Sequence, residues 1–159
     1  MEARTAGIEG GPGRMQAHLR MGWCLLSVFM VLGVALEAMH AFKLGWFLDL
    51  ANETRRLLLR LAHAHGVLGG LVNIGFALSL PHRAPLGERA EVWISRCILL
   101  GSVLLPTGFL LGGLVVRGGD PNPAVVLAPL GALLLVAGVV GVAWSFLARG
   151  GSSGRGRTG

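Results

Sequence analysis

The sequence is poor in charge and in aromatic side chains. Only 14% of its 159 residues are charged and 6% are aromatic, tyrosine is absent, and 53% are hydrophobic. The apolar residues come in blocks, and long stretches such as 103–116 and 125–144 carry no charged residue. A water-soluble domain of this length needs polar residues along one face of each helix. The deficit therefore excludes such a domain and indicates a chain surrounded mainly by lipid.

Cysteine and acidic residues are also scarce. Cys24 and Cys97 form neither a CxxC motif nor the paired framework of a small secreted domain, which favours ordinary buried thiols. With 14 basic against 8 acidic residues, the net charge is +6. Such an excess is typical of nucleic-acid binders, but here the basic residues lie in the tails and short loops at the ends of apolar blocks. That distribution follows the positive-inside rule, so we predict no nucleic-acid partner.

Recognisable enzyme chemistry is missing as well. The sequence contains no phosphate-binding loop, no nucleophile–base set and no complete set of metal ligands. This absence argues against a self-contained enzyme, and we assign no catalytic residue.

Four apolar blocks are present, and they predict four membrane-spanning helices at about 21–42, 57–80, 92–116 and 123–148. Each block exceeds the roughly 20 residues that a hydrocarbon core of about 30 Å requires. We therefore predict an all-α integral membrane four-helix bundle of up-down-up-down topology, in one domain over 21–148. A disordered leader (1–20) and a disordered tail (149–159), both rich in Gly and Arg, are expected to flank it. Gly118-Gly119 begins a strong turn signal before the fourth block.

Tryptophan and arginine positions predict the orientation. Trp23, Trp93 and Trp144 lie at one set of block ends and Trp46 lies beyond the opposite end, where headgroup layers favour amphipathic rings. With four spans both termini share a side, and that side holds nine basic residues: Arg4, Arg14, Arg20, Arg83, Arg89, Arg96, Arg149, Arg155 and Arg157. The other side holds five: Lys43, Arg55, Arg56, Arg60 and Arg117. The excess predicts a multi-pass protein of the cytoplasmic membrane with both termini in the cytoplasm.

Small residues recur at steps of three and four within the spans. The clearest stripes are His63, Gly66, Gly70, Asn73 and Ala77; Gly101, Leu105, Gly108 and Gly112; and Gly131, Leu134, Gly138, Gly141 and Ser145. A mean step of 3.5 residues is that of a left-handed bundle, and small residues let helices approach in lipid. Gly66-x-x-x-Gly70 and Gly108-x-x-x-Gly112 can also join separate chains, so a homo-oligomer or a larger membrane complex remains open, although we expect packing within the bundle.

One group of ionisable residues lies inside the predicted spans. Glu37 is about five residues, or ~7.5 Å, from the end of the first span, and His63 has a similar depth in the second, so antiparallel packing would make them level. The candidate polar cluster comprises Glu37, His40, Lys43, Arg60, His63 and Asn73. Ionisable groups at such depth usually face a bundle interior or a water-filled cavity. His63 and His65 are about 200° apart around a helix, so only one faces inward, and His63 is predicted to do so.

Three interpretations of this cluster remain open. The side chains can simply pair and fix helix register in an accessory or structural membrane subunit. Alternatively, His40 with His63 or His65 binds a metal or haem b as opposed axial ligands, with the glycines leaving room for a flat macrocycle, in a membrane redox protein. Thirdly, Glu37 and a histidine exchange a proton in proton- or ion-coupled transport.

The run LAHAHGVLG at 61–69, with Glu37 in the preceding span, resembles the second span of small four-helix bacterial membrane proteins that carry an HxH motif followed by glycines. It is also loosely similar to the histidine-bearing span of haem-copper oxidase subunit I. The resemblance covers about two spans and implies that the matching histidine is a haem ligand. The chain has too few spans and lacks the histidines of a copper centre, so oxidase activity is not implied.

Overall fold

A computed structural model describes residues 3–48, 53–84 and 86–152, and these residues are almost entirely helical. The long helices are α1 (Ala3–Ala41), α3 (Glu53–Ser79), α4 (Glu88–Leu114) and α5 (Leu127–Ser152). Shorter elements are α2 (Gly45–Leu48) and the 3-10 turns η2 (Leu80–His82) and η3 (Pro123–Val126). Four segments are long and apolar enough to cross a membrane: Gly11–Ala41, Glu53–His82, Glu88–Leu114 and Pro123–Ala148. The predicted all-α, four-span architecture is confirmed.

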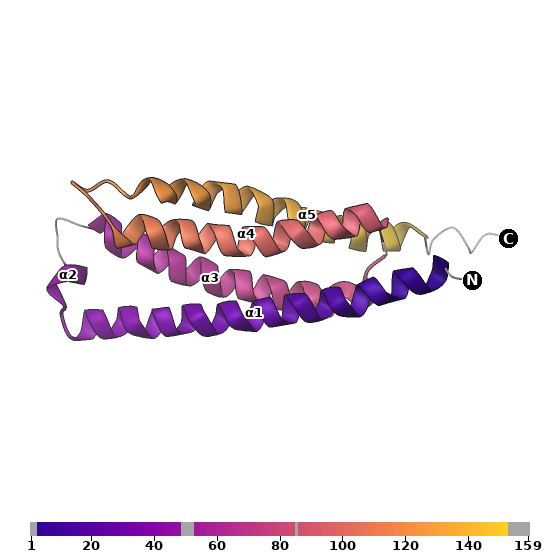
Figure 1. The fold of residues 1–159 in the computed structure, drawn as a ribbon, viewed down its shortest axis with the longest axis horizontal. Helices are drawn as coiled ribbons and strands as arrows, with labels where there is room; N and C mark the ends of the chain where they lie inside the picture. Colours follow the sequence, from indigo (N-terminus) through magenta and orange to yellow (C-terminus); the bar gives the residue numbers. More distant parts are fainter. Residues whose placement is uncertain (1–2, 49–52, 85, 153–159) are drawn as a thin grey trace.

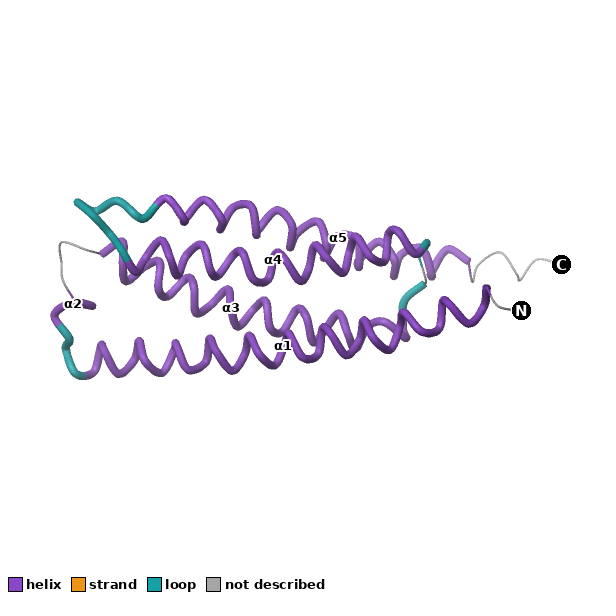
Figure 2. The backbone as a smooth tube through the Cα atoms, in the orientation of Figure 1, coloured by secondary structure: helices purple, strands orange, loops and turns teal. Residues whose placement is uncertain are grey.

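The long helices run alternately in opposite directions, and the start of α1 and the end of α5 lie at the same end of the molecule (Figure 1). We call this the terminal end and the other the distal end. At the terminal end η2 leads from α3 to α4, whereas α2 and the α4–α5 connection lie at the distal end (Figure 2). Gly118 and Gly119 form the tight part of that connection with φ of 59° and 90°, a conformation that suits glycine because it lacks a Cβ.

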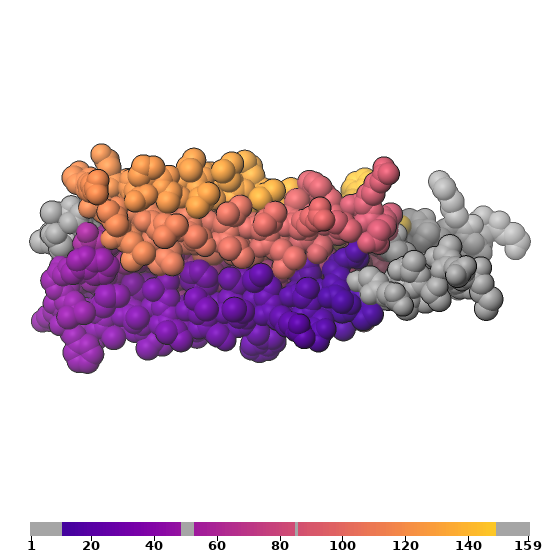
Figure 3. Space-filling model, in the orientation of Figure 1, coloured from indigo at the N-terminus to yellow at the C-terminus, as the bar shows by residue number. Residues whose placement is uncertain are grey.

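The four long helices form an open row. α1 packs on α3, α3 on α4 and α4 on α5, whereas α1 and α5 share no extended contact among the described residues. Figure 1 shows this order, and Figure 3 shows the elongated shape of the molecule. α1 reaches α4 at the terminal end, through hydrogen bonds of His18 and Arg14. The outer faces of α1 and α5 are therefore both uncovered.

Close backbone approach explains why the predicted glycine stripes face neighbouring helices. A Cβ on Gly131 of α5 would lie 2.3 Å from the Leu105 nitrogen of α4, and one on Gly108 would lie 2.4 Å from the Ala128 nitrogen. On the other side of the row, a Cβ on Gly70 of α3 would lie 2.9 Å from the Gly22 oxygen of α1. Because lipid supplies no hydrophobic drive for association, such contacts carry the packing. The expectation that these glycines pack within the bundle is confirmed.

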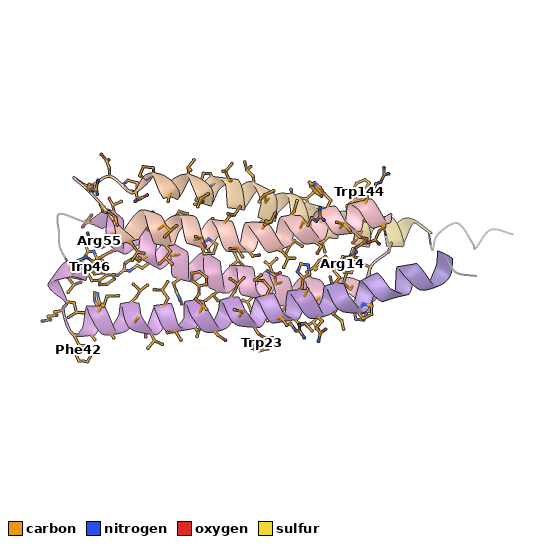
Figure 4. All side chains as sticks on the ribbon, viewed as in Figure 1. Arg14, Trp23, Phe42, Trp46, Arg55 and Trp144 are labelled. Carbon is orange, nitrogen blue, oxygen red and sulfur yellow. The ribbon has the colours of Figure 1, made fainter. Side chains whose placement is uncertain are left out.

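The tryptophans lie on the surface of the helix row. All four are exposed, and Trp46 lies at the distal end beside Phe42 and Arg55, while Trp144 lies towards the terminal end (Figure 4). From Trp23 to the end of α1 at Ala41 the helix rises by about 27 Å. The apolar segment Gly11–Ala41 begins 12 residues, or about 18 Å, before Trp23, so Trp23 does not mark that end of the span.

α1 begins upstream of the predicted first span and includes residues that the composition predicts as a leader. α1 begins at Ala3, and Arg14 and His18 have partners on α3 and α4, so the helix continues well before Met21 because its side chains gain contacts there. At the other end, α5 continues to Ser152, past the predicted end of the fourth span at 148. Residues 1–2 and 153–159 lie outside the described part of the chain.

Candidate functional site

The predicted polar cluster is divided in the structure. Glu37 and His40 of α1 and Arg60 and His63 of α3 line one groove of about 620 Å³ at the distal end, which we call the distal groove. Its apolar walls come from Met30, Val34, Leu36 and Phe47. Lys43 lies in the turn after α1 with φ of 51°, exposed and outside the groove lining. Asn73 and His65 lie elsewhere on α3.

His63 is held against α1 by its own ring nitrogen. Its Nδ1 lies 2.7 Å from the carbonyl oxygen of Phe29, and since a carbonyl only accepts, Nδ1 carries the proton and donates. In the neutral ring Nε2 is then left as an acceptor. A Cβ on Gly33 would lie 2.4 Å from Cε1 of His63, so the ring fills the space that this glycine provides.

The register between α1 and α3 differs from the predicted one by about a turn. Gly33 lies level with His63, so Glu37, four residues further on, lies about 6 Å closer to the distal end. Among the described residues Glu37, His40 and Arg60 make no hydrogen bond or ion pair, and all three are exposed. The expectation that Glu37 and His63 are level was wrong, because the fit of the Phe29 ring over Gly66 and of His63 over Gly33 fixes a different register.

His65 faces away from the distal groove. Its Nδ1 lies 2.8 Å from the Leu61 oxygen one turn earlier, and its ring centre lies 5.1 Å from that of Phe109 on α4. His63 therefore contacts α1 while His65 contacts α4, as the 200° between them requires. The two imidazoles do not share a ligand position.

A second polar centre, centred on His18, was not predicted. His18 is fully buried, with Nδ1 2.7 Å from Asn73 Oδ1 and Nε2 2.8 Å from Ser95 Oγ. Asn73 Nδ2 donates to the Gly69 oxygen and to Ser102 Oγ, both at 2.8 Å. The carbonyl of Gly69 fixes the amide orientation, so Nδ1 of His18 must be the donor to Oδ1. We call His18, Asn73, Ser95 and Ser102 the His18 network; it links α1, α3 and α4.

Charged residues adjoin this network at the terminal end. Arg83 binds both carboxylate oxygens of Glu91, and Arg14 lies 2.8 Å from Glu88 and 3.7 Å from Glu91. The Phe76 ring lies between the two centres, 4.4 Å from the His18 ring and 5.3 Å from the Arg83 guanidinium. A bidentate Arg–carboxylate pair fixes geometry strongly. The charges thus anchor the α3–α4 connection and the first turns of the α1 span.

The described residues do not fit a haem held between two histidines. His40 lies seven residues beyond Gly33 on α1, about 10 Å along the axis from the level of His63, so the two rings do not oppose each other. The glycines leave no room for a macrocycle either, because the rings of His63 and Phe29 fill the spaces over Gly33 and Gly66. Within the described ranges, no three His, Cys, Asp or Glu side chains are grouped closely enough to hold a metal ion.

The fold defines a class of protein, a multi-pass α-helical membrane protein in which α1 begins and α5 ends at the same end of the helix row. A search for relatives adds no narrower identity: no family model, curated protein or solved structure matches the chain.

Proposed function

We propose that the protein is an accessory or structural subunit of the cytoplasmic membrane that packs against a transmembrane helix of a partner. The observation that carries this proposal is the open row of helices. Helix association in lipid depends on van der Waals contact, and four helices gain most of it by closing into a ring. α1 and α5 make no extended van der Waals contact with each other. A partner helix packed along α5 would supply this contact.

The outer face of α5 is the surface that we assign to the partner. Six large apolar residues form a continuous stripe along it, each 51–71% exposed: Leu130, Leu133, Val136, Val140, Trp144 and Leu147. The opposite face of α5 is held on α4 through Gly131, Gly138 and Gly141. The stripe runs the length of the span without a charge, so it suits an apolar helix better than a water-exposed domain.

Photo-crosslinking in living cells tests this assignment. A photoreactive amino acid at Val136 is expected to give a discrete adduct with a different polypeptide, because that side chain points away from α4. At Leu135, which is 7% exposed and lies in the α4–α5 core, the same probe should give no such adduct. Lipid adducts alone at Val136, or an adduct with a second copy of this chain, would contradict the proposal.

The proposal includes cytoplasmic termini, which the nine-to-five distribution of basic residues supports. A fluorescent protein fused after Gly159 folds only in the cytoplasm and reports that side directly. Proton-coupled transport is less well supported, since a direct exchange between Glu37 and His63 requires contact that a one-turn offset does not favour.

The haem- or metal-binding alternative drawn from the sequence resemblance would depend on His63 alone. Its acceptor Nε2 and the donation from Nδ1 to a carbonyl are features of metal-ligating histidines, but no opposed histidine completes an axial pair. We therefore expect the oxidised and reduced spectra of the detergent-purified protein to lack a Soret band. A Soret band that disappears in His63→Ala and persists in His65→Ala would overturn this expectation.

A further inference from the structure

The distal groove runs from the level of the headgroups into the hydrocarbon layer. His40, at its outer end, is one residue from the end of α1, and Met30, at its inner end, is ten residues or about 15 Å deeper. Trp46 marks the headgroup level beside the outer end, where the Arg55 guanidinium lies 4.6 Å from its ring centre (Figure 4). Met30 and Val34 are 54% and 63% exposed, so the groove is open to the surrounding lipid.

The outer half of the groove carries one fixed charge of each sign. Arg60 and Glu37 both line it, and neither has an ion-pair partner among the residues that the structure describes. Two imidazoles add hydrogen-bonding capacity: His40 has at least one N–H donor, and because Nδ1 of His63 donates to the Phe29 carbonyl, Nε2 is the ring nitrogen that can accept. The groove therefore offers donors for an anion and acceptors for an N–H cation within one site.

From this arrangement we propose that the distal groove binds one molecule of phosphatidylethanolamine. The phosphate takes the donors of Arg60 and His40, and the primary ammonium donates to Glu37 and to Nε2 of His63. The inner half of the groove, with Met30, Val34 and other apolar walls, accommodates the first part of an acyl chain. This site is independent of the partner surface on α5.

Charge complementarity distinguishes this lipid from others with the same chains. An anionic headgroup such as phosphatidylglycerol places no cation beside Glu37 and leaves that carboxylate next to a negative charge. Phosphatidylcholine has a cation of the right sign but no N–H with which to donate to Glu37 or His63. Charge-assisted hydrogen bonds are the strong ones, so the primary ammonium is the recognised feature.

Native mass spectrometry of the delipidated protein, titrated with the three lipids at matched chain length, tests the proposal. We expect phosphatidylethanolamine to be retained about tenfold more than the other two, which corresponds to ~1.4 kcal/mol. Glu37→Gln should reduce its retention to that of phosphatidylcholine, and Arg60→Gln should reduce the retention of all three. Arg117→Gln removes the same charge in the α4–α5 connection, outside the groove lining, and should leave the preference unchanged.

The preference among lipids can also be measured as the increase in the unfolding midpoint temperature that each lipid gives. This second measurement needs little protein, so it also serves for a variant recovered in low yield. Equal retention of the three lipids by the wild-type protein would overturn the site, as would an unchanged preference in Glu37→Gln. Preferential retention of phosphatidylglycerol would assign the groove to anionic lipid and would overturn the proposed role of Glu37.

Discussion

Replacing Gly131 with alanine is expected to destabilise the bundle by about 3 kcal/mol or more, above the ~1–3 kcal/mol that overpacking usually costs. The added methyl would lie 2.3 Å from the Leu105 nitrogen and 2.8 Å from the Leu105 Cα. These atoms belong to the backbone of α4, so no side-chain rotation relieves the overlap. The whole of α5 must move away from α4, and the neighbouring close contacts at Gly101 and Gly108 are then lost as well.

The same change at Gly75 provides the matched control. Gly75 lies within α3, and a Cβ there would have no atom within 4 Å. Alanine should stabilise that helix by about 0.5–1 kcal/mol, because glycine is the poorer helix former. Thermal unfolding in detergent should therefore show opposite shifts of the midpoint temperature for Gly131→Ala and Gly75→Ala. If both substitutions raise the midpoint, α4 and α5 do not approach as closely as this seam requires.

The packing seams were predictable from sequence because their signal is local. Small residues at steps of three and four mark the face of a helix that a neighbour can approach, whichever neighbour it is. The choice of neighbour is not local: the stripe on α4 that includes Gly101 and Gly108 faces α5, and nothing in its spacing indicates that α1 and α5 stay apart. The open row depends on how all four faces fit together.

The distal groove was predicted in part. The four ionisable residues that line it were all proposed, but their register was estimated from the ends of apolar blocks, which do not fix where Phe29 meets Gly66. Asn73 was grouped with His63 because both lie on one face of the helix. Ten residues separate them, a rise of about 15 Å along the axis. Axial distance alone was therefore enough to exclude Asn73 from that cluster.

His18 was not predicted as a buried residue because the start of the first span was placed from the composition of the apolar block and not from the helical periodicity. The buried residues of α1 that face its neighbours continue through it at steps of three and four: His18, Gly22, Leu25, Phe29, Gly33 and Leu36. Gly, Arg and Ala upstream of Met21 were typical of a flexible leader. The helical face nevertheless extends past the apolar block, and that periodicity was the signal in the sequence that could have revealed the buried histidine.

Asn73→Leu is expected to be the most damaging change of a polar residue, at about 2–4 kcal/mol. The amide makes hydrogen bonds to three other residues in a fully buried position, and its loss leaves His18 Nδ1–H and Ser102 Oγ without these partners. Each buried polar group left unsatisfied costs about 1–3 kcal/mol. Hydrogen bonds between membrane helices measure lower, at about 0.6 kcal/mol on average and up to about 1.7 kcal/mol, but Asn73 makes bonds to three residues in one fully buried position, so their losses combine.

A double-mutant cycle with His18→Leu separates this network from simple packing. The loss of stability in Asn73→Leu is expected to come mainly from the imidazole of His18, which loses its hydrogen-bond partner. Replacing His18 with leucine as well should therefore restore part of the free energy of unfolding, because two apolar side chains leave fewer buried polar groups unpaired. The double variant should then be more stable than the sum of the single effects predicts by about 1–2 kcal/mol. His40→Leu, which changes an exposed histidine of the same helix, should have little effect on unfolding. If the changes in the free energy of unfolding of His18→Leu and Asn73→Leu were strictly additive, the two residues would not be coupled. The contacts at the terminal end would then depend on the ion pairs of Arg14 and Arg83 with Glu91 instead.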